Sequence, residues 1–119
     1  MGARRILLVD GDSDSRSIYR IMLKHSGYDV VEVEDGHGAL VATLADCDAV
    51  VMELTLRGPD GHSLLAELLR KQPALCVVVL TARALEEDRE RAVRAGCRRY
   101  LTKPLEPQQL VRELDELLG

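Results

Sequence analysis

Residues 48–61 read DAVVMELTLRGPDG, and this stretch decides the fold. Ala49–Met52 is a short, continuous apolar run, typical of a strand that is covered on both faces. The run ends in a single acid, Glu53, and then breaks into a Gly/Pro/Asp turn that opens a segment with helical apolar spacing. A buried strand that ends in a carboxylate and leads into a helix indicates an α/β fold with a polar site at the sheet edge.

Strand-like and helix-like segments alternate five times along the chain. The predicted strands are Ile6–Val9, Val30–Val33, Ala49–Met52, residues 75–80 with Thr81 at the end, and residues 99–101. The first predicted helix has Ile18, Ile21, Met22 and His25 on one face and stops at Gly27, and the second is a short one around residues 39–44. The third has Leu64, Leu65, Leu68 and Leu69 inside, and the fourth covers residues 85–95. The fifth begins at Pro107 and has Leu110, Leu114, Leu117 and Leu118 inside.

The helix-length connections predict parallel strands in a doubly wound, three-layer α/β sandwich. The first, third and fourth strands are continuously apolar, as central strands should be. Glu32 interrupts the second strand, and Arg98 and Arg99 open the fifth, so both of these resemble edge strands. The order 2-1-3-4-5 places both at the edges, with a ligand site at the carboxyl ends of strands one and three.

Composition narrows the class of protein. The length of 119 residues predicts one domain, 1–119, and the absence of Phe and Trp predicts an aliphatic core. The net charge of −4 argues against direct nucleic-acid binding. No apolar run is long enough for a membrane span, and no signal peptide is evident. Cys47, Cys76 and Cys97 form no CxxC pair, which argues against a disulfide framework or zinc site and favours the cytoplasm.

Four predicted strand ends carry polar residues that would meet at one edge of the sheet. They are Asp10, Gly11 and Asp12 after the first strand, Glu53 after the third, Thr81 after the fourth and Lys103 after the fifth. An Asp after a strand is, taken singly, usually a helix cap or a turn residue. Taken together, the acids after the first and third strands, the hydroxyl after the fourth and the lysine after the fifth indicate a functional site.

The chain resembles a response-regulator receiver domain of two-component signalling, with a flavodoxin-like fold, over essentially its whole length. The resemblance rests on ILLVDGDSDSR (6–16), LTAR (80–83) and AGCRRYLTKP (95–104), and on the spacing of Asp10, Glu53, Thr81 and Lys103. It implies a magnesium ion held by acids of the first loop and an aspartate that accepts a phosphoryl group. It further implies that Thr81 and Lys103 bind the phosphoryl oxygens, that Tyr100 is the aromatic switch residue, and that the Lys103–Pro104 peptide bond is cis.

Three positions depart from the family pattern. Gly11 replaces the second acid of the first loop, Glu53 replaces the phosphoacceptor aspartate, and Arg57 stands where a proline is usual. Glutamate moves the carboxylate by one C–C bond, about 1.5 Å, and adds a torsion. We therefore expect a weak or absent Mg²⁺ site at Asp10, Asp12 and Glu53, with Asp12 capping the first helix, and no other cofactor.

The phosphoacceptor position leaves several readings open. We expect Glu53 to reach toward Lys103 and Thr81, where a phosphoryl group would lie. The sequence does not decide whether Glu53 imitates the active state or locks the resting one, nor whether it is native. Tyr100 either keeps its switch role or packs at the sheet edge with its hydroxyl in water. His25 and His62 on helices and His37 in a loop are interpreted as surface or packing residues, since they lack metal-ligand spacing.

The leading functional prediction is a non-enzymatic signalling module that is degenerate at its phosphorylation site and acts by protein–protein contact. Its partner would be a histidine kinase, an effector, a downstream domain or a second copy. The docking face would be helix 4, strand 5 and helix 5, which carry Arg89, Arg91, Arg94, Arg98, Arg99, Glu86, Glu87 and Glu90. The chain would be a stand-alone regulator or a piece of a longer one. The alternatives are a working receiver and a flavodoxin-like cofactor binder, which the missing aromatics disfavour.

Overall fold

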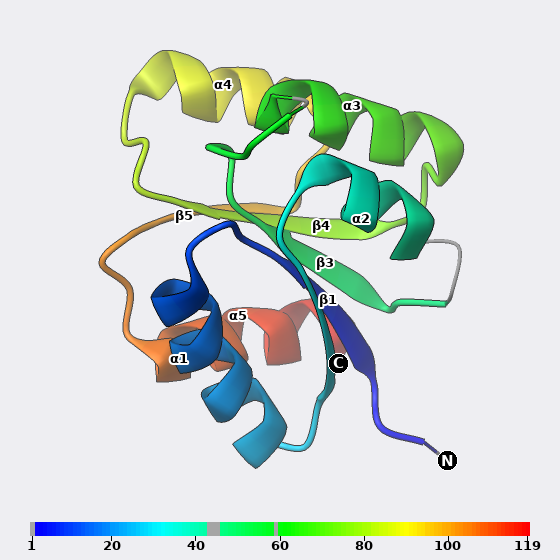
Figure 1. Cartoon of the computed structure of the whole chain (residues 1–119), viewed down its shortest axis with the longest axis vertical. Helices are drawn as coiled ribbons and strands as arrows, with labels where there is room; N and C mark the ends of the chain where they lie inside the picture. The colour runs from blue at the N-terminus through cyan, green and yellow to red at the C-terminus, as the bar shows by residue number, and fades with distance from the viewer. Residues whose placement is uncertain (1, 43–45, 59) are drawn as a thin grey trace.

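The computed structural model describes residues 2–42, 46–58 and 60–119, and shows five parallel strands in one sheet with the order β2-β1-β3-β4-β5 (Figure 1). The strands are β1 (Arg5–Val9), β2 (Asp29–Val33), β3 (Ala49–Met52), β4 (Cys76–Thr81) and β5 (Arg99–Thr102). The helices are α1 (Ser13–His25), α2 (Gly36–Ala42), α3 (Gly61–Lys71), α4 (Glu86–Ala95) and α5 (Pro107–Leu118). The predicted strand order is confirmed, and the predicted end of the second helix at 44 lies outside the described residues.

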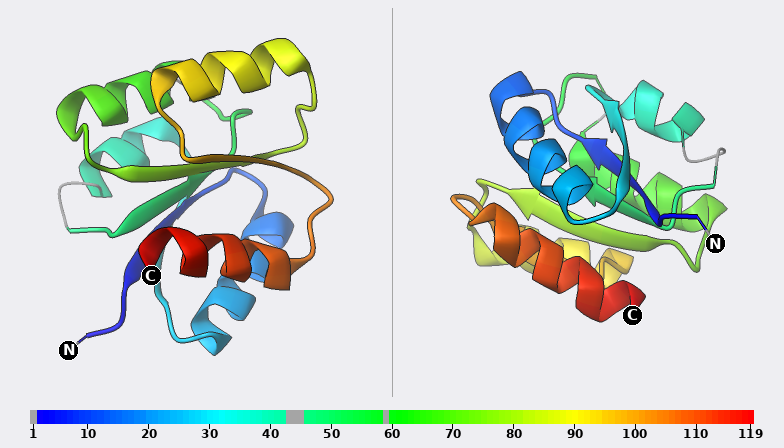
Figure 2. Two further views of the ribbon diagram at one scale, coloured as in Figure 1. Left: turned by 180° about the vertical axis from the view of Figure 1, so that it is seen from behind. Right: turned by 90° about the horizontal axis from the view of Figure 1, so that it is seen from below.

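Helices cover both faces of the sheet. Helices α2, α3 and α4 lie on one face, and α1 and α5 lie on the other, as the view from behind in Figure 2 shows. Successive side chains of a strand point to opposite faces, so β1 contributes Leu7 and Val9 to the first layer and Ile6 and Leu8 to the second. The sheet is therefore the middle layer of a three-layer sandwich, and its core is predominantly aliphatic.

The face of α1 that carries Ile18, Ile21, Met22 and His25 is not the face that this helix buries. Tyr19 and Leu23 are the buried residues of this helix, whereas Ile18 and Ile21 are 54% and 61% exposed. Contacts with two other parts of the chain accompany this orientation. Arg16 and Arg20 on α1 form ion pairs of 3.2 and 3.0 Å with Glu32 on the edge strand β2. The Tyr19 hydroxyl donates to Leu105 O, in the loop before α5, at 2.8 Å. Apolar spacing alone does not reveal these tertiary contacts.

No helix among the described residues combines the length and the apolar character needed to cross a membrane.

The start of α3 packs directly against the backbone that follows Glu53. A Cβ atom placed on Gly61 would lie 2.3 Å from the backbone oxygen and 2.4 Å from the Cα of Leu54. The only relief would be to move α3 away from the end of β3. A glycine at position 61 therefore allows the start of α3 to pack closely against the backbone of Leu54, directly after Glu53.

We predict that Gly61→Ala lowers the free energy of unfolding by about 3 kcal/mol, at the upper end of overpacking costs. Gly11→Ala is the matched control, because a Cβ at Gly11 would meet only the Glu34 backbone oxygen at an ordinary 3.5 Å, and its effect should stay within about 0.5 kcal/mol. Denaturant unfolding of both variants measures the difference. Equal stabilities would show that the close packing of α3 on Leu54 is not required.

Candidate functional site

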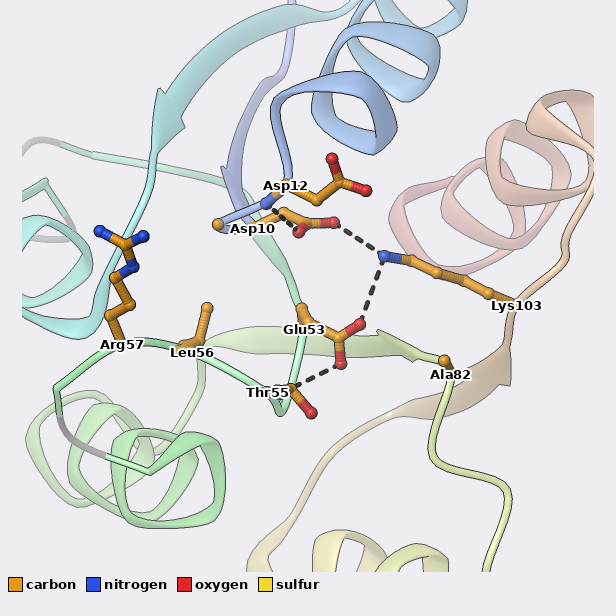
Figure 3. A pocket seen from close by; sticks show the side chains of 9 residues that line it. Asp10, Asp12, Glu53, Thr55, Leu56, Arg57, Ala82 and Lys103 are labelled. Carbon is orange, nitrogen blue, oxygen red and sulfur yellow. Dashed lines mark hydrogen bonds and ion pairs between the residues drawn. The ribbon is translucent and has the colours of Figure 1, made fainter.

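The carboxyl ends of β1, β3 and β5 bring three charged side chains together. Each follows directly on its strand and continues the hydrogen-bond ladder, with Asp10 N donating to Val33 O (3.1 Å), Glu53 N to Val9 O (2.9 Å) and Lys103 N to Thr81 O (2.8 Å). The sheet therefore fixes the backbone from which each side chain starts. Figure 3 shows the three side chains pointing toward one another.

Lys103 bridges the two carboxylates. Its Nζ lies 2.8 Å from Asp10 Oδ2 and 3.3 Å from Glu53 Oε1 (Figure 3), and the three side chains are 18%, 7% and 9% exposed. Burial alone would lower the pKa of Lys103, but the contacts with Asp10 and then Glu53 outweigh it, so the net shift of this pKa is upward. The ammonium is thus held in its charged form between two acids.

The second oxygen of Glu53 turns back onto the chain that follows it. Glu53 Oε2 accepts hydrogen bonds from the backbone N–H groups of Leu54 (2.7 Å) and Thr55 (3.2 Å). The extra methylene of glutamate, compared with aspartate, gives the carboxylate the reach to contact Lys103 with one oxygen and these N–H groups with the other. Both oxygens of Glu53 are therefore occupied by the protein itself.

The first loop uses its acids in the same way. Asp10 Oδ1 accepts from Asp12 N at 2.9 Å, and Asp12 caps α1 by accepting from Asp14 N at 3.1 Å. The predicted capping role of Asp12 is confirmed. Gly11 contributes no side chain. Among the described residues, no three His, Cys, Asp or Glu side chains lie in an arrangement that could hold a metal ion.

Thr81 does not meet Glu53 in the way the sequence suggested. It is fully buried, and its Oγ1 accepts a hydrogen bond from Arg83 N at 3.2 Å. Among the described residues no hydrogen bond joins Thr81 to Glu53. The predicted contact of Glu53 with Lys103 is present, whereas the predicted contact with Thr81 is not made as a hydrogen bond among these residues, and Thr81 Oγ1 accepts from the loop after β4 instead.

An open cavity of about 630 Å³ lies over these strand ends. Its lining residues are Asp10, Gly11, Asp12, Glu53, Thr55, Leu56, Arg57, Ala82 and Lys103. Arg57 is exposed and points away from Glu53 and Lys103 (Figure 3). The cavity thus has room for a ligand, but its central charged groups are paired with one another.

Tyr100 points into the protein. Only 7% of it is exposed, and its hydroxyl donates to Arg83 O at 2.7 Å, so the reading in which this hydroxyl lies in water is wrong. Burial, followed by the charge of Asp88, raises the pKa of Tyr100. The Lys103–Pro104 peptide bond is cis, as the resemblance implies.

The histidines differ from one another more than expected. His25 is exposed at the end of α1, and His37 lies within α2 rather than in a loop. His62 is only 4% exposed and its Nε2 lies 2.9 Å from Asp88 Oδ1. Sequence reasoning did not pair these two residues, since they start different helices and no local pattern connects positions 26 apart.

The sequence model of the response regulator receiver domain family matches residues 6–115, and the chain belongs to this family. The transcriptional regulatory protein GlrR of Escherichia coli K12 is 33% identical over 114 residues, which cover 95% of this chain and 26% of that regulator. The chain therefore spans about a quarter of the length of this curated relative.

Solved structures show the same fold. A CheY-like receiver domain protein from Methanospirillum hungatei superposes with a TM-score of 0.94 at 24% identity, covering 98% of this chain and 94% of that one. The receiver domain of the sensor histidine kinase PA1611 from Pseudomonas aeruginosa has a TM-score of 0.87 at 32% identity, with 97% of both chains covered. That domain holds a magnesium ion in its active-site cleft. The family match does not favour a flavodoxin-like cofactor binder.

We predict that Lys103→Met lowers the free energy of unfolding at neutral pH by roughly 3 kcal/mol. This is the lower end of the cost of breaking a buried ion pair, because Lys103 stays partly exposed. Chemical denaturation measures the loss. Lys24→Met, on the exposed side of α1, is the control and should change stability by no more than about 0.5 kcal/mol. Equal stability of Lys103→Met and the parent would contradict the bridging role.

The bridge also predicts an alkaline limit. Because folding raises the Lys103 pKa, its stabilising contribution is complete below the ordinary value of 10.5 and is lost as the pH rises through the folded value. Denaturant unfolding from pH 8 upward should show the stability gap between parent and Lys103→Met closing only above this point. A gap that is independent of pH in this range would refute the ion pairing.

Proposed function

We propose that this chain is a single receiver domain of a two-component system that no longer accepts a phosphoryl group and acts by protein–protein contact. The observation that carries the proposal is the double engagement of the Glu53 carboxylate, with Lys103 on one oxygen and the Leu54 and Thr55 N–H groups on the other. These hydrogen bonds fix the direction in which the carboxylate oxygens point, and an in-line attack on phosphorus would require a different orientation.

Geometry adds to this obstacle. In-line phosphoryl transfer depends almost wholly on positioning and electrostatic stabilisation, and a misplacement on the order of 1 Å costs about 100-fold. Glu53 carries one more methylene than the aspartate that the family uses, so its oxygens start from a different place. Lys103, which would bind the phosphoryl oxygens, already donates to Asp10 and Glu53.

We also propose that magnesium binds weakly here. Mg²⁺ requires near-ideal octahedral oxygen ligands, and the residues present do not supply them. Asp10 and Glu53 are both paired with Lys103, Asp12 caps α1, and Gly11 has no ligand atom. A bound Mg²⁺ would compete with the ammonium of Lys103 for the oxygens of Asp10 and Glu53, so no phosphorylation step is assigned to it.

Glu53 is therefore a partial substitute for a phosphoryl group. It contributes a charge of about −1, against roughly −1.5 to −2 for a protein phosphate, and it reaches Lys103 but not Thr81. Because the charged groups of the site are paired with one another, the surrounding loops would keep one arrangement without a phosphodonor. The protein would thus present a constant surface to its partner rather than a switched one.

The docking face that we propose comprises α4, β5 and α5. Leu85 and Val93 are 61% and 53% exposed beside the arginines and glutamates of α4, a mixture of apolar and charged groups that suits a protein partner. A histidine kinase, an effector domain or a second copy of the chain would bind there in the cytoplasm. Because the relative GlrR is named a transcriptional regulatory protein, an effector that acts in transcription is the preferred partner class.

We predict no phosphorylation of the parent chain by a small phosphodonor with Mg²⁺, measured by intact mass. The double variant Gly11→Asp/Glu53→Asp should gain one phosphoryl group in part of the molecules, since it restores a metal ligand and shortens the acceptor. A Cβ at Gly11 would lie 3.5 Å from the nearest backbone oxygen, so the start of the new side chain fits without a clash.

Gly11→Asp/Glu53→Gln is the matched control, since it has the restored loop acid but no acceptor carboxylate at position 53. It should remain unlabelled. Stoichiometric labelling of the parent would reject the proposed function and establish a working receiver. An unlabelled double variant would show that positions 11 and 53 are not the cause of the defect.

A further inference from the structure

A buried histidine lies outside the phosphoryl site and takes no part in it. His62 is 4% exposed at the start of α3, a helix that also buries Leu64, Leu65 and Leu68. Its Nε2 lies 2.9 Å from Asp88 Oδ1, and its Nδ1 is buried without a hydrogen-bond partner among the described residues. Within the part of the chain that the structure describes, the contact with Asp88 is thus the one polar interaction that orients this ring.

Asp88 also contacts Arg83 in the loop between β4 and α4. The same oxygen, Asp88 Oδ1, lies 3.2 Å from a guanidinium nitrogen of Arg83. Helices α3 and α4 lie side by side on one face of the sheet (Figure 1), so the His62–Asp88 pair joins the first turns of two neighbouring helices. Arg83, which precedes α4, is held against that junction.

The backbone of Arg83 is where the two switch-type side chains meet. Its N–H donates to Thr81 Oγ1 at 3.2 Å, and its carbonyl oxygen accepts from the Tyr100 hydroxyl at 2.7 Å. Thr81 ends β4 and Tyr100 lies in β5, so one residue of the loop orients side chains from two strands. Anything that fixes Arg83 therefore also fixes the inward position of Tyr100.

We propose that His62 is a positioning residue for Tyr100, acting through Asp88 and Arg83 without touching Tyr100 itself. The inference rests on the proposed function, in which the β5 surface around Tyr100 is the docking face. It assigns the constant shape of that face to a buried link between α3 and α4, in addition to the Glu53 site.

The charges around His62 support the link. The charged group of α4 that faces His62 is Asp88. Arg83, in the loop between β4 and α4, contacts the same carboxylate. The hydrogen bond from His62, followed by the charge of Arg83, holds the pKa of Asp88 below its ordinary value of 3.8. Asp88 therefore stays ionised and able to accept from both partners at neutral and mildly acidic pH.

Fluorine NMR of the full chain labelled with 3-fluorotyrosine tests the proposal. The chain has three tyrosines, whose resonances are assigned with the single Tyr→Phe variants. His62→Leu fills the buried space but cannot donate, so the Tyr100 resonance should shift or double while those of Tyr19 and Tyr28 stay in place. His62→Gln keeps a donor near the Nε2 position and should restore the parent spectrum. His25→Leu, on the exposed end of α1, is the surface control.

An unchanged Tyr100 resonance in His62→Leu would overturn the proposal. If His62→Leu fails to fold, Asp88→Ala breaks the same link from the other side, and it should also shift Tyr100 alone. A parent-like spectrum of Asp88→Ala overturns the proposal whatever His62→Leu does. Phosphoryl labelling of the parent chain would reject the proposed function without moving this result, so the two failures are distinguishable.

Discussion

The ion bridge from Lys103 to Asp10 and Glu53 is the interaction on which the site depends. Three strands end at this point, and each delivers its charged residue from a backbone that the sheet holds in place. Two carboxylates that are less than a tenth exposed would repel each other without a cation between them. The ammonium of Lys103 supplies that charge, and its contacts with Asp10 and Glu53 raise the pKa of Lys103.

The extra methylene of Glu53, compared with aspartate, determines which groups its carboxylate contacts. A glutamate at position 53 is long enough to bind Lys103 and to fold back onto the N–H groups of Leu54 and Thr55. Both oxygens of the Glu53 carboxylate thereby have hydrogen-bond partners within the protein. We propose on this basis a fixed docking module in place of a switch, in which the inward Tyr100 donates to Arg83 O.

Local patterns were sufficient to predict the strands, their order and the edge where Asp10, Glu53 and Lys103 meet, because apolar runs and parallel topology determine which strand ends coincide. They were insufficient where tertiary contacts decide. Helix α1 has Tyr19 inside and Ile21 outside, an orientation in which Arg16 and Arg20 pair with Glu32. The turn of Thr81 toward Arg83 and the pairing of His62 with Asp88 join residues through space. Neither leaves a periodic signal in the sequence.

A crystal structure determined from crystals grown in saturating magnesium chloride tests the central claim most directly. The account predicts that Lys103 Nζ remains within hydrogen-bonding distance of both Asp10 and Glu53, and that Glu53 still accepts from Leu54 N. Electron density for an octahedral Mg²⁺ coordinated by Asp10 and Glu53, with the lysine displaced, would contradict it.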